Sequence, residues 1–238
     1  MKKRWRRAGC VVLAAALLIG LLPVPKAAAE LDGVEAKSAI LMSADTGAVL
    51  YDKNSHERRA CGSVTKVMSL LLFMEALDSG QVSLGDEVTV SEFANSMGGS
   101  EIWLEVGEVM TFEDLLRSVV IQSANDSTVA LAEYVAGSEE AFLNRMNERA
   151  AELGMNDTHY LNTTGFDEDG QYTSAYDIAL AARELTKHAA SRAGSFSGRC
   201  FSGGAFAKTG RSGRNRRGGR SRSASCGTGS LKTIFCPA

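Results

Sequence analysis

An apolar stretch without a polar face most constrains how this chain of 238 residues can fold. Residues 67–77 read Val-Met-Ser-Leu-Leu-Leu-Phe-Met-Glu-Ala-Leu, in which only Ser69 and Glu75 are polar. A helix that is apolar nearly all round has to be buried, because it has no side to turn toward water. The sequence therefore predicts a core helix over this stretch, enclosed by the rest of a folded domain.

A serine and a lysine stand at the start of this helix. Ser63 and Lys66 are three residues apart, so a helical backbone brings their side chains to one side. A serine hydroxyl becomes a strong nucleophile when a neighbouring base removes its proton, and burial keeps a lysine amine neutral enough to be that base. Taken alone, such a pair is more often a first-turn serine beside a solvated lysine, because the spacing recurs by chance.

A second polar group, Ser123-Ala-Asn125, is predicted to lie in a tight connection between two helices. The first helical segment begins at Thr111 with a sequence typical of a capping box. The second runs from about residue 127 to residue 135 and is closed by Gly137. A connection held by two packed helices can aim a hydroxyl and an amide into a cleft, whereas the alternative interpretation is a polar turn with a capping serine.

Other segments predict a hairpin and further helices. Residues 38–44 and 48–51 flank the turn Asp45-Thr-Gly47, which is typical of a β-hairpin. Capping residues and apolar spacing predict two more helices, and short β-forming runs predict two extended pieces. The helices are expected at 138–153 and 174–185, and the extended pieces at 86–90 and 102–105.

Histidine and cysteine positions predict neither a metal site nor a cofactor. The histidines stand in unrelated contexts without the spacing of metal ligands: His56, His159 and His188. Cys61, close to Ser63, is interpreted as a packing residue. The later cysteines match no zinc motif: Cys200, Cys226 and Cys236.

The first 29 residues predict a secretory signal peptide. Residues 1–7 are strongly basic, residues 11–22 are apolar, and Ala27-Ala-Ala29 is a cleavage site of the A-x-A kind. The apolar run is shorter than the roughly 20 residues that a membrane span needs, so a retained anchor is the lesser alternative. Cys10 precedes the apolar run and is not placed for lipidation. The mature protein is expected to start at Glu30 and to be exported, outside the cytoplasmic membrane.

The C-terminal region departs from these patterns. No acidic residue follows Glu184, and residues 191–230 are dominated by Gly, Ser, Arg and Ala. Hydrophobic periodicity ends there, so residues 189–238 are predicted to be a disordered Arg/Gly/Ser-rich tail. We hypothesise a shift of the reading frame near residues 187–190, because out-of-frame translation of GC-rich coding sequence tends to give these residue types. Sequencing across this point tests the hypothesis, and an intact frame would contradict it.

Together with Ser96-Met-Gly-Gly-Ser100 and Asn162-Thr-Thr-Gly-Phe166, the two motifs resemble the serine-type D-alanyl-D-alanine carboxypeptidases, which are low-molecular-weight penicillin-binding proteins. The resemblance runs from about residue 38 to residue 187. It implies an α/β (α+β) domain of the β-lactamase/transpeptidase kind, with a central antiparallel sheet and a helical cluster. Family members continue with strands that complete the sheet, so the catalytic domain expected in residues 30–188 carries an incomplete sheet.

The resemblance also implies roles for the site residues. Ser63 would form the acyl-enzyme, Lys66 would accept its proton, Ser123 would relay protons to the leaving D-alanine, and Asn125 would hydrogen-bond the substrate peptide. Ser-Ala-Asn in place of Ser-Asp-Asn favours carboxypeptidases over class A β-lactamases. Glu140 opens a string like that around the deacylating glutamate of those lactamases, but its place in the first turn of a capped helix indicates a solvated glutamate. A penicillin acyl-enzyme is therefore expected to be long-lived.

The implied function is removal of the terminal D-alanine from peptidoglycan stem peptides, with β-lactams as inhibitors and without a cofactor or a nucleic-acid partner. Lys208-Thr-Gly210 matches the family's third motif, but its surroundings are not strand-like, which favours a chance match. A membrane-associating C-terminus, usual in the family, is expected to be lost. The alternatives are an inactive truncated penicillin-binding module, a β-lactamase-related serine hydrolase, and a protein whose basic tail binds anionic wall polymer or lipid.

Overall fold

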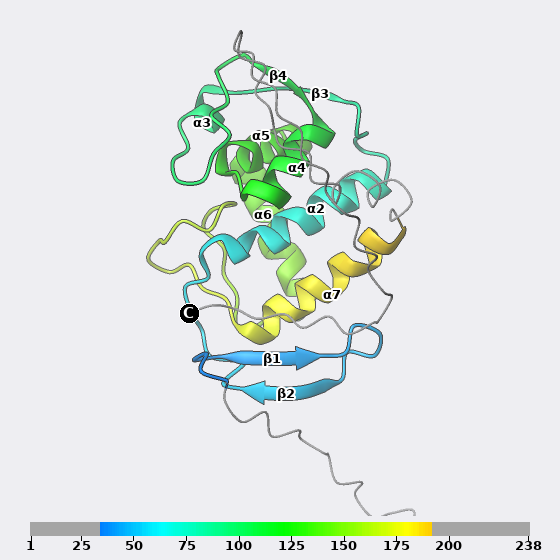
Figure 1. Ribbon diagram of the computed structural model, residues 1–238, viewed down its shortest axis with the longest axis vertical. Helices are drawn as coiled ribbons and strands as arrows, with labels where there is room; N and C mark the ends of the chain where they lie inside the picture. Colours follow the sequence, from blue (N-terminus) through cyan, green and yellow to red (C-terminus); the bar gives the residue numbers. More distant parts are fainter. Residues whose placement is uncertain (1–33, 192–238) are drawn as a thin grey trace, which may run out of the picture. The chain divides into compact units, whose positions relative to one another are not determined.

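The structure is a computed structural model that describes residues 34–191, with side chains to residue 188. The predicted signal peptide, the Arg/Gly/Ser-rich tail and Lys208-Thr-Gly210 lie outside the described residues. The strands are short and all precede α4, and four helices then follow one another to the end of this part of the chain (Figure 1). Their order is β1 Ala39–Met42, β2 Val49–Lys53, η1 Gly62–Thr65, α2 Lys66–Asp78, β3 Glu87–Thr89, α3 Glu92–Asn95, β4 Val109–Thr111, α4 Phe112–Gln122, α5 Asn125–Ala136, α6 Glu139–Glu152 and α7 Ala175–Ser191.

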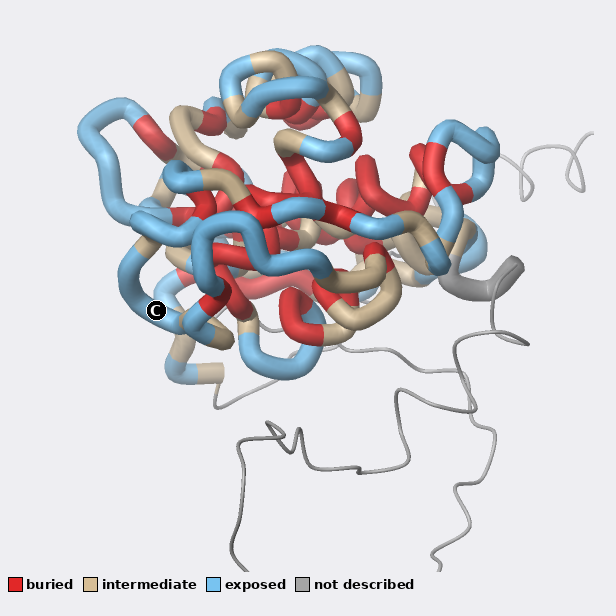
Figure 2. Tube along the Cα trace, turned by 90° about the horizontal axis from the view of Figure 1, so that it is seen from above, coloured by how far each residue is buried: buried red, intermediate tan, exposed pale blue. Residues whose placement is uncertain are grey.

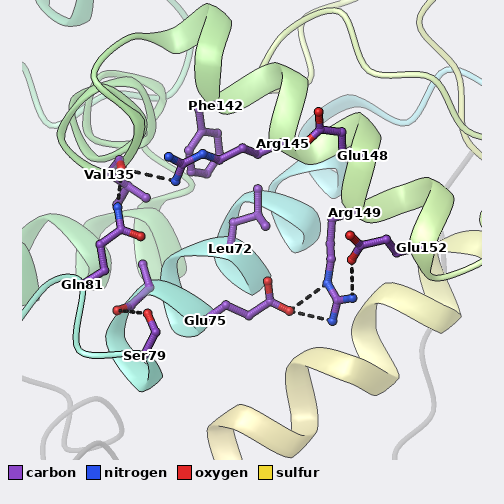
Figure 3. Close-up of a pocket in the computed structure, with 11 residues that line it drawn as sticks. Leu72, Glu75, Ser79, Gln81, Val135, Phe142, Arg145, Glu148, Arg149 and Glu152 are labelled. Atoms are coloured by element: carbon purple, nitrogen blue, oxygen red, sulfur yellow. Dashed lines mark hydrogen bonds and ion pairs between the residues drawn. The ribbon is translucent and has the colours of Figure 1, made fainter.

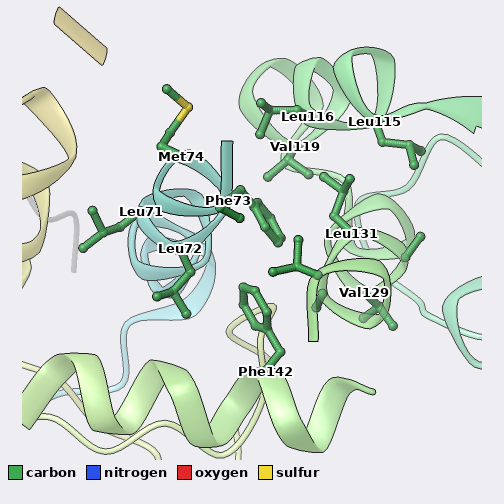
Figure 4. Close-up of a cluster of buried hydrophobic side chains, with 14 of the residues drawn as sticks. Leu71, Leu72, Phe73, Met74, Leu115, Leu116, Val119, Val129, Leu131 and Phe142 are labelled. Carbon is green, nitrogen blue, oxygen red and sulfur yellow. The ribbon is translucent and has the colours of Figure 1, made fainter. Parts of the chain in front are cut away.

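The apolar stretch forms the predicted core helix, α2. Nine of its thirteen residues are buried, and it packs against α5, α6 and α7. Buried stretches gather in the interior of the described part of the chain, and exposed ones lie on its outside (Figure 2). Phe73 of α2 meets the rings of Phe112 and Phe142 at centroid distances of 6.3 and 5.0 Å, within a cluster to which α4, α5 and α6 all contribute (Figure 4).

The predicted hairpin is confirmed as the antiparallel pair β1 and β2. Its turn contains Gly47 at φ +73, a backbone conformation that glycine adopts without steric cost. Helix α7 covers the hairpin through a small cluster of Ile40, Ala175 and Ala179, and it also packs against α2. Figure 1 shows α7 between the hairpin and α2. The described residues thus contain two small antiparallel sheets, β1 with β2 on α7 and β3 with β4, and a cluster of helices, consistent with an incomplete α/β domain.

Three boundaries differ from the prediction. Strand β3 pairs with β4, whereas residues 102–105 form no strand, because the left-handed φ of +56 at Trp103 breaks the extended backbone. Helix α5 begins at Asn125 and not near residue 127, since the Thr128 N–H already makes the first helical hydrogen bond, to the carbonyl of Ala124. Helix α7 extends to Ser191 and not to residue 185, and a contact of 2.6 Å between His188 Nδ1 and Asp78 Oδ2 holds its last turns on α2.

The capping predictions are confirmed. Thr111 Oγ1 accepts the N–H of Asp114 at the start of α4, and Ser138 Oγ accepts the N–H of Ala141 at the start of α6. Such caps satisfy backbone donors that a helix leaves unpaired in its first turn. No helix among residues 34–191 combines the length and the apolar character needed to cross a membrane.

Candidate active site

Ser63 and Lys66 lie at the point where the chain enters α2. Ser63 belongs to the 3₁₀ turn η1, and Lys66 is the first residue of α2. The serine is therefore not part of the α-helix itself. In a 3₁₀ turn, residues three apart are eclipsed, which brings their side chains together even more directly. Lys66 Nζ lies 3.2 Å from Ser63 Oγ, within hydrogen-bonding distance.

Lys66 is buried, with 3 % of its surface exposed. Its amine donates a second hydrogen bond, of 2.8 Å, to the carbonyl of Thr164. Burial lowers the pKa of Lys66 from 10.5 to about 8, because desolvation disfavours the charged ammonium. The alternative interpretation of a solvated lysine is therefore wrong, and the amine has the environment that a base near neutral pH requires.

This pKa sets an expected pH dependence. Only the neutral amine can accept the proton of Ser63. The fraction of Lys66 that is neutral falls about tenfold for each pH unit below a pKa of about 8. We expect the acylation rate to rise with pH and to reach half of its maximum near pH 8. Acylation by a β-lactam, measured between about pH 6 and pH 10, tests this. A rate that is constant or that falls between about pH 6 and pH 8 would contradict it.

A loop at residues 162–166, here called the 162–166 loop, forms a wall beside the pair. A Cβ placed on Gly165 would lie 1.8 Å from the Gly62 carbonyl oxygen and 3.0 Å from the Ser63 nitrogen, so only glycine permits this approach. Asn162 Oδ1 accepts the N–H of Gly165 at 2.7 Å, and Asn162 Nδ2 donates to the Phe166 carbonyl at 3.0 Å. The asparagine thereby fixes the turn that places the glycine against η1.

Buried polar contacts hold this loop from behind. Ser69 Oγ of α2 donates to the Thr163 carbonyl at 2.8 Å, and Glu139 Oε1 accepts the Thr163 hydroxyl at 2.9 Å. Glu140, the neighbour of Glu139, is exposed in the first turn of α6, as predicted for a solvated glutamate. The glutamate that supports the loop beside the site is thus Glu139, which the sequence analysis did not single out.

Replacing Ser69 with alanine is expected to lower the free energy of unfolding by about 1–3 kcal/mol, because the Thr163 carbonyl would lose its buried partner. Urea unfolding measures the change. Ser79→Ala is a matched control, since Ser79 Oγ also donates to a backbone carbonyl, at 3.0 Å from Ala76 O, but near the exposed end of α2. Equal effects of the two substitutions would show that the buried hydrogen bond of Ser69 stabilises the fold no more than the exposed one of Ser79.

Ser123 and Asn125 join α4 to α5. Ser123 ends α4 in a left-handed conformation, with φ 57 and ψ 35, which is costly for a residue with a side chain and is typical of functional sites. No hydrogen bond within residues 34–188 joins Ser123 to Ser63 or Lys66. Asn125 Nδ2 donates to the Gly98 carbonyl at 2.7 Å, and its buried Oδ1 has no partner within that range. An unpaired buried acceptor suits a ligand that brings a donor.

The 162–166 loop connects the two motifs. A Cβ placed on Gly99 would lie 2.9 Å from Asn125 Nδ2 and 3.4 Å from Phe166 Cζ, so Asn125 and Phe166 converge on this glycine. Thr164 of the same loop accepts the Lys66 hydrogen bond. The pair and Asn125 therefore border one region. Sequence reasoning used the loop only for its resemblance, although Asn-x-x-Gly could have indicated a tight turn.

A separate cavity of about 330 Å³ lies at the other end of α2. Glu75 of α2, Ser79 just past its end, and Arg145 and Arg149 of α6 line it. Arg149 pairs with Glu75 at 2.8 Å (Figure 3). It contains neither motif and is not part of the candidate site. Residues 34–191 hold no group of three or more His, Cys, Asp or Glu side chains that could bind a metal ion.

Comparisons with known proteins agree with the fold and with the predicted family. Residues 25–199 match the family described as D-alanyl-D-alanine carboxypeptidase. The chain belongs to this family of serine peptidases, as the sequence motifs predicted, and the match continues past residue 187, where the sequence resemblance was placed.

Individual relatives support the same assignment. The chain is 50 % identical over 186 residues to D-alanyl-D-alanine carboxypeptidase DacF of Bacillus subtilis, an alignment that covers 74 % of this chain and 48 % of that protein. The crystal structure of D-alanyl-D-alanine carboxypeptidase DacD from Francisella tularensis superposes with a TM-score of 0.63 at 35 % identity, over 73 % of this chain and 40 % of that one. The crystal structure of penicillin binding protein 6B from Escherichia coli superposes with a TM-score of 0.62 at 36 % identity, over 64 % of this chain and 50 % of that one. The chain thus spans half or less of each relative.

Proposed function

We propose that this protein is a serine-type D-alanyl-D-alanine carboxypeptidase that acts outside the cytoplasmic membrane on peptidoglycan stem peptides. One observation carries the proposal: a desolvated lysine amine, with a pKa of about 8, lies 3.2 Å from a serine hydroxyl. An activated serine next to its base is the arrangement that covalent acyl transfer requires. The names of the relatives, which are D-alanyl-D-alanine carboxypeptidases and a penicillin-binding protein, supply the substrate class and the expected inhibitors.

In the proposed reaction, Ser63 Oγ attacks the carbonyl carbon of the penultimate D-alanine while Lys66 takes the hydroxyl proton. The C–N bond of the terminal peptide breaks, and the leaving D-alanine takes up a proton that Ser123 relays. Asn125 holds the substrate by a hydrogen bond to its peptide, for which the unpaired Oδ1 is available. The Ser63 N–H supports the developing oxyanion. Water then hydrolyses the ester and restores Ser63.

Covalent labelling tests the proposal. The purified protein is incubated with benzylpenicillin, and its intact mass is compared with that of a Ser63→Ala variant. The wild type is expected to gain the mass of one benzylpenicillin molecule, and the variant to gain none. Because Glu140 is solvated and is not placed as a deacylating base, the adduct should persist. Folded wild-type protein without an adduct would contradict the proposal and favour the inactive penicillin-binding module.

A further inference from the structure

Asp126 is a buried carboxylate beside the candidate site that the proposed reaction does not use. It follows Asn125 in the first turn of α5 and is 1 % exposed. Its Oδ2 accepts the N–H groups of Ile102 at 3.1 Å and of Leu104 at 3.2 Å, and its Oδ1 accepts the N–H of Ser127 at 2.7 Å. The carboxylate thus holds a segment that lies more than twenty residues earlier in the chain.

The backbone at Trp103 explains how one carboxylate binds both amides. Trp103 has a φ of +56, a left-handed conformation that is rare and costly for a bulky residue. A left-handed residue turns the amides on its two sides toward one point, which makes a cradle for an anion. Its own side chain is 72 % exposed, so packing contributes little to holding this conformation. Asp126 supplies the anion, and the positive end of α5 favours its charge.

The same segment also holds Asn125. We call residues 98–104 the 98–104 segment. Its Gly98 carbonyl accepts Asn125 Nδ2, and its Ser100 carbonyl accepts the Asn125 N–H, both at 2.7 Å. Asp126 therefore binds one end of the segment while Asn125 binds the other. Because Asn125 Oδ1 has no partner within residues 34–188, the Gly98 carbonyl is the contact that fixes the orientation of the amide.

We propose that Asp126 is a positioning residue for the acylation reaction: it clamps the 98–104 segment onto α5 and so holds the Asn125 amide ready for the amide of a substrate or β-lactam. This inference rests on the proposed function. Replacing Asp126 with asparagine keeps the shape of the side chain, but its NH₂ group has to face either the N–H groups of Ile102 and Leu104 or the N–H of Ser127, and either orientation weakens the clamp. Ligands that present an acylamino side chain to Asn125 should then suffer most.

Two β-lactams separate positioning from general damage. Benzylpenicillin carries an acylamino side chain, whereas 6-aminopenicillanic acid has a free amine there. We expect Asp126→Asn to slow acylation by benzylpenicillin roughly tenfold or more, since a small displacement of a positioning group has large effects on rate. The ratio of the two acylation rates should fall about fivefold, because only benzylpenicillin loses a hydrogen bond.

Asp177→Asn is the matched control. Asp177 is also 1 % exposed in a first helical turn, and it accepts the Asp157 N–H at 2.8 Å and the Thr158 hydroxyl at 2.7 Å, but it belongs to α7. Its substitution should leave the rate ratio unchanged. Of the two tryptophans, Trp5 belongs to the predicted signal peptide, so Trp103 is the sole reporter in the protein that starts at Glu30. Fluorescence anisotropy should decay faster in Asp126→Asn and remain as in the parent in Asp177→Asn.

The outcomes are separable. A rate ratio that is the same in Asp126→Asn as in Asp177→Asn, in a parent that is acylated, overturns this inference alone. A folded parent that is never acylated overturns the proposed function, and the inference fails with it. If Asp126→Asn does not fold, Asp126→Glu keeps the charge but displaces it by one methylene, and a roughly threefold fall in the rate ratio is then expected. An unchanged ratio in that variant would equally overturn the inference.

Discussion

Replacing Lys66 with methionine is expected to slow the acylation of Ser63 by about 1,000-fold, which is within the usual contribution of a general base. Methionine fills nearly the same space without an amine, so the geometry of η1 should survive while proton acceptance is lost. Burial is already unfavourable for the lysine amine, as its pKa of about 8 indicates, so its removal should largely offset the loss of the partner of the Thr164 carbonyl and leave the free energy of unfolding within about 1 kcal/mol of the wild type. Stopped-flow acylation by a fluorescent penicillin, together with urea unfolding, measures both effects.

Lys53→Met is the matched control for this experiment. Lys53 Nζ also donates to a backbone carbonyl, that of Val34 at 2.7 Å, but it lies on β2. Its removal should leave the acylation rate within about twofold, as is usual for a site away from the reacting groups. A Lys66→Met variant that retains a tenth or more of the wild-type rate would show that another group accepts the proton of Ser63.

The sequence predicts best those features that local patterns determine. The apolar run identifies α2, the turn around Gly47 identifies the hairpin, and Ser138 identifies the start of α6, because each is encoded within a few neighbouring residues. The spacing of Ser63 and Lys66 likewise predicts their contact, since it depends on a single helical turn. Even the position of Ser63 in a 3₁₀ turn does not disturb this prediction.

The support around the site depends on contacts between distant segments, and the sequence does not reveal them. The run Ile-Trp-Leu looks like a strand, yet the buried carboxylate of Asp126 holds Trp103 in a left-handed conformation. The last turns of α7 are kept by Asp78, which lies on another helix. In both places a long-range polar contact outweighs local propensity, which is why the expected strand is absent and the helix is longer than predicted.

Packing of α2 explains why the lysine is buried. Helix α2 supplies much of the core and also carries Lys66, so packing of its apolar residues removes the amine from water. The backbone acceptor of its amine, the Thr164 carbonyl, comes from the 162–166 loop. The activated pair therefore needs two distant parts of the chain: the helix that desolvates it and the loop that closes over it.

Replacing Gly165 with alanine tests the second of these requirements. The new Cβ would lie 1.8 Å from the Gly62 oxygen and 2.4 Å from its carbon, so backbone has to move on one side or the other. We expect the free energy of unfolding to fall by about 4 kcal/mol, a value at the upper end for single substitutions. Displacement of η1 should also slow acylation about 100-fold, because Ser63 would leave its position relative to Lys66.

Gly170→Ala separates the clash from the cost of the backbone conformation. Gly170 has a φ of +97, close to the +92 of Gly165, but its added Cβ would meet only Leu161 Cδ1 at 3.5 Å, an ordinary contact. Its alanine variant should lose only about 1–2 kcal/mol of stability, the cost of a left-handed alanine, and should keep the wild-type acylation rate. Equal losses of stability and of acylation rate in the two variants would mean that the 162–166 loop moves away to accommodate the new Cβ. Its close approach to η1 would then not be what positions Ser63.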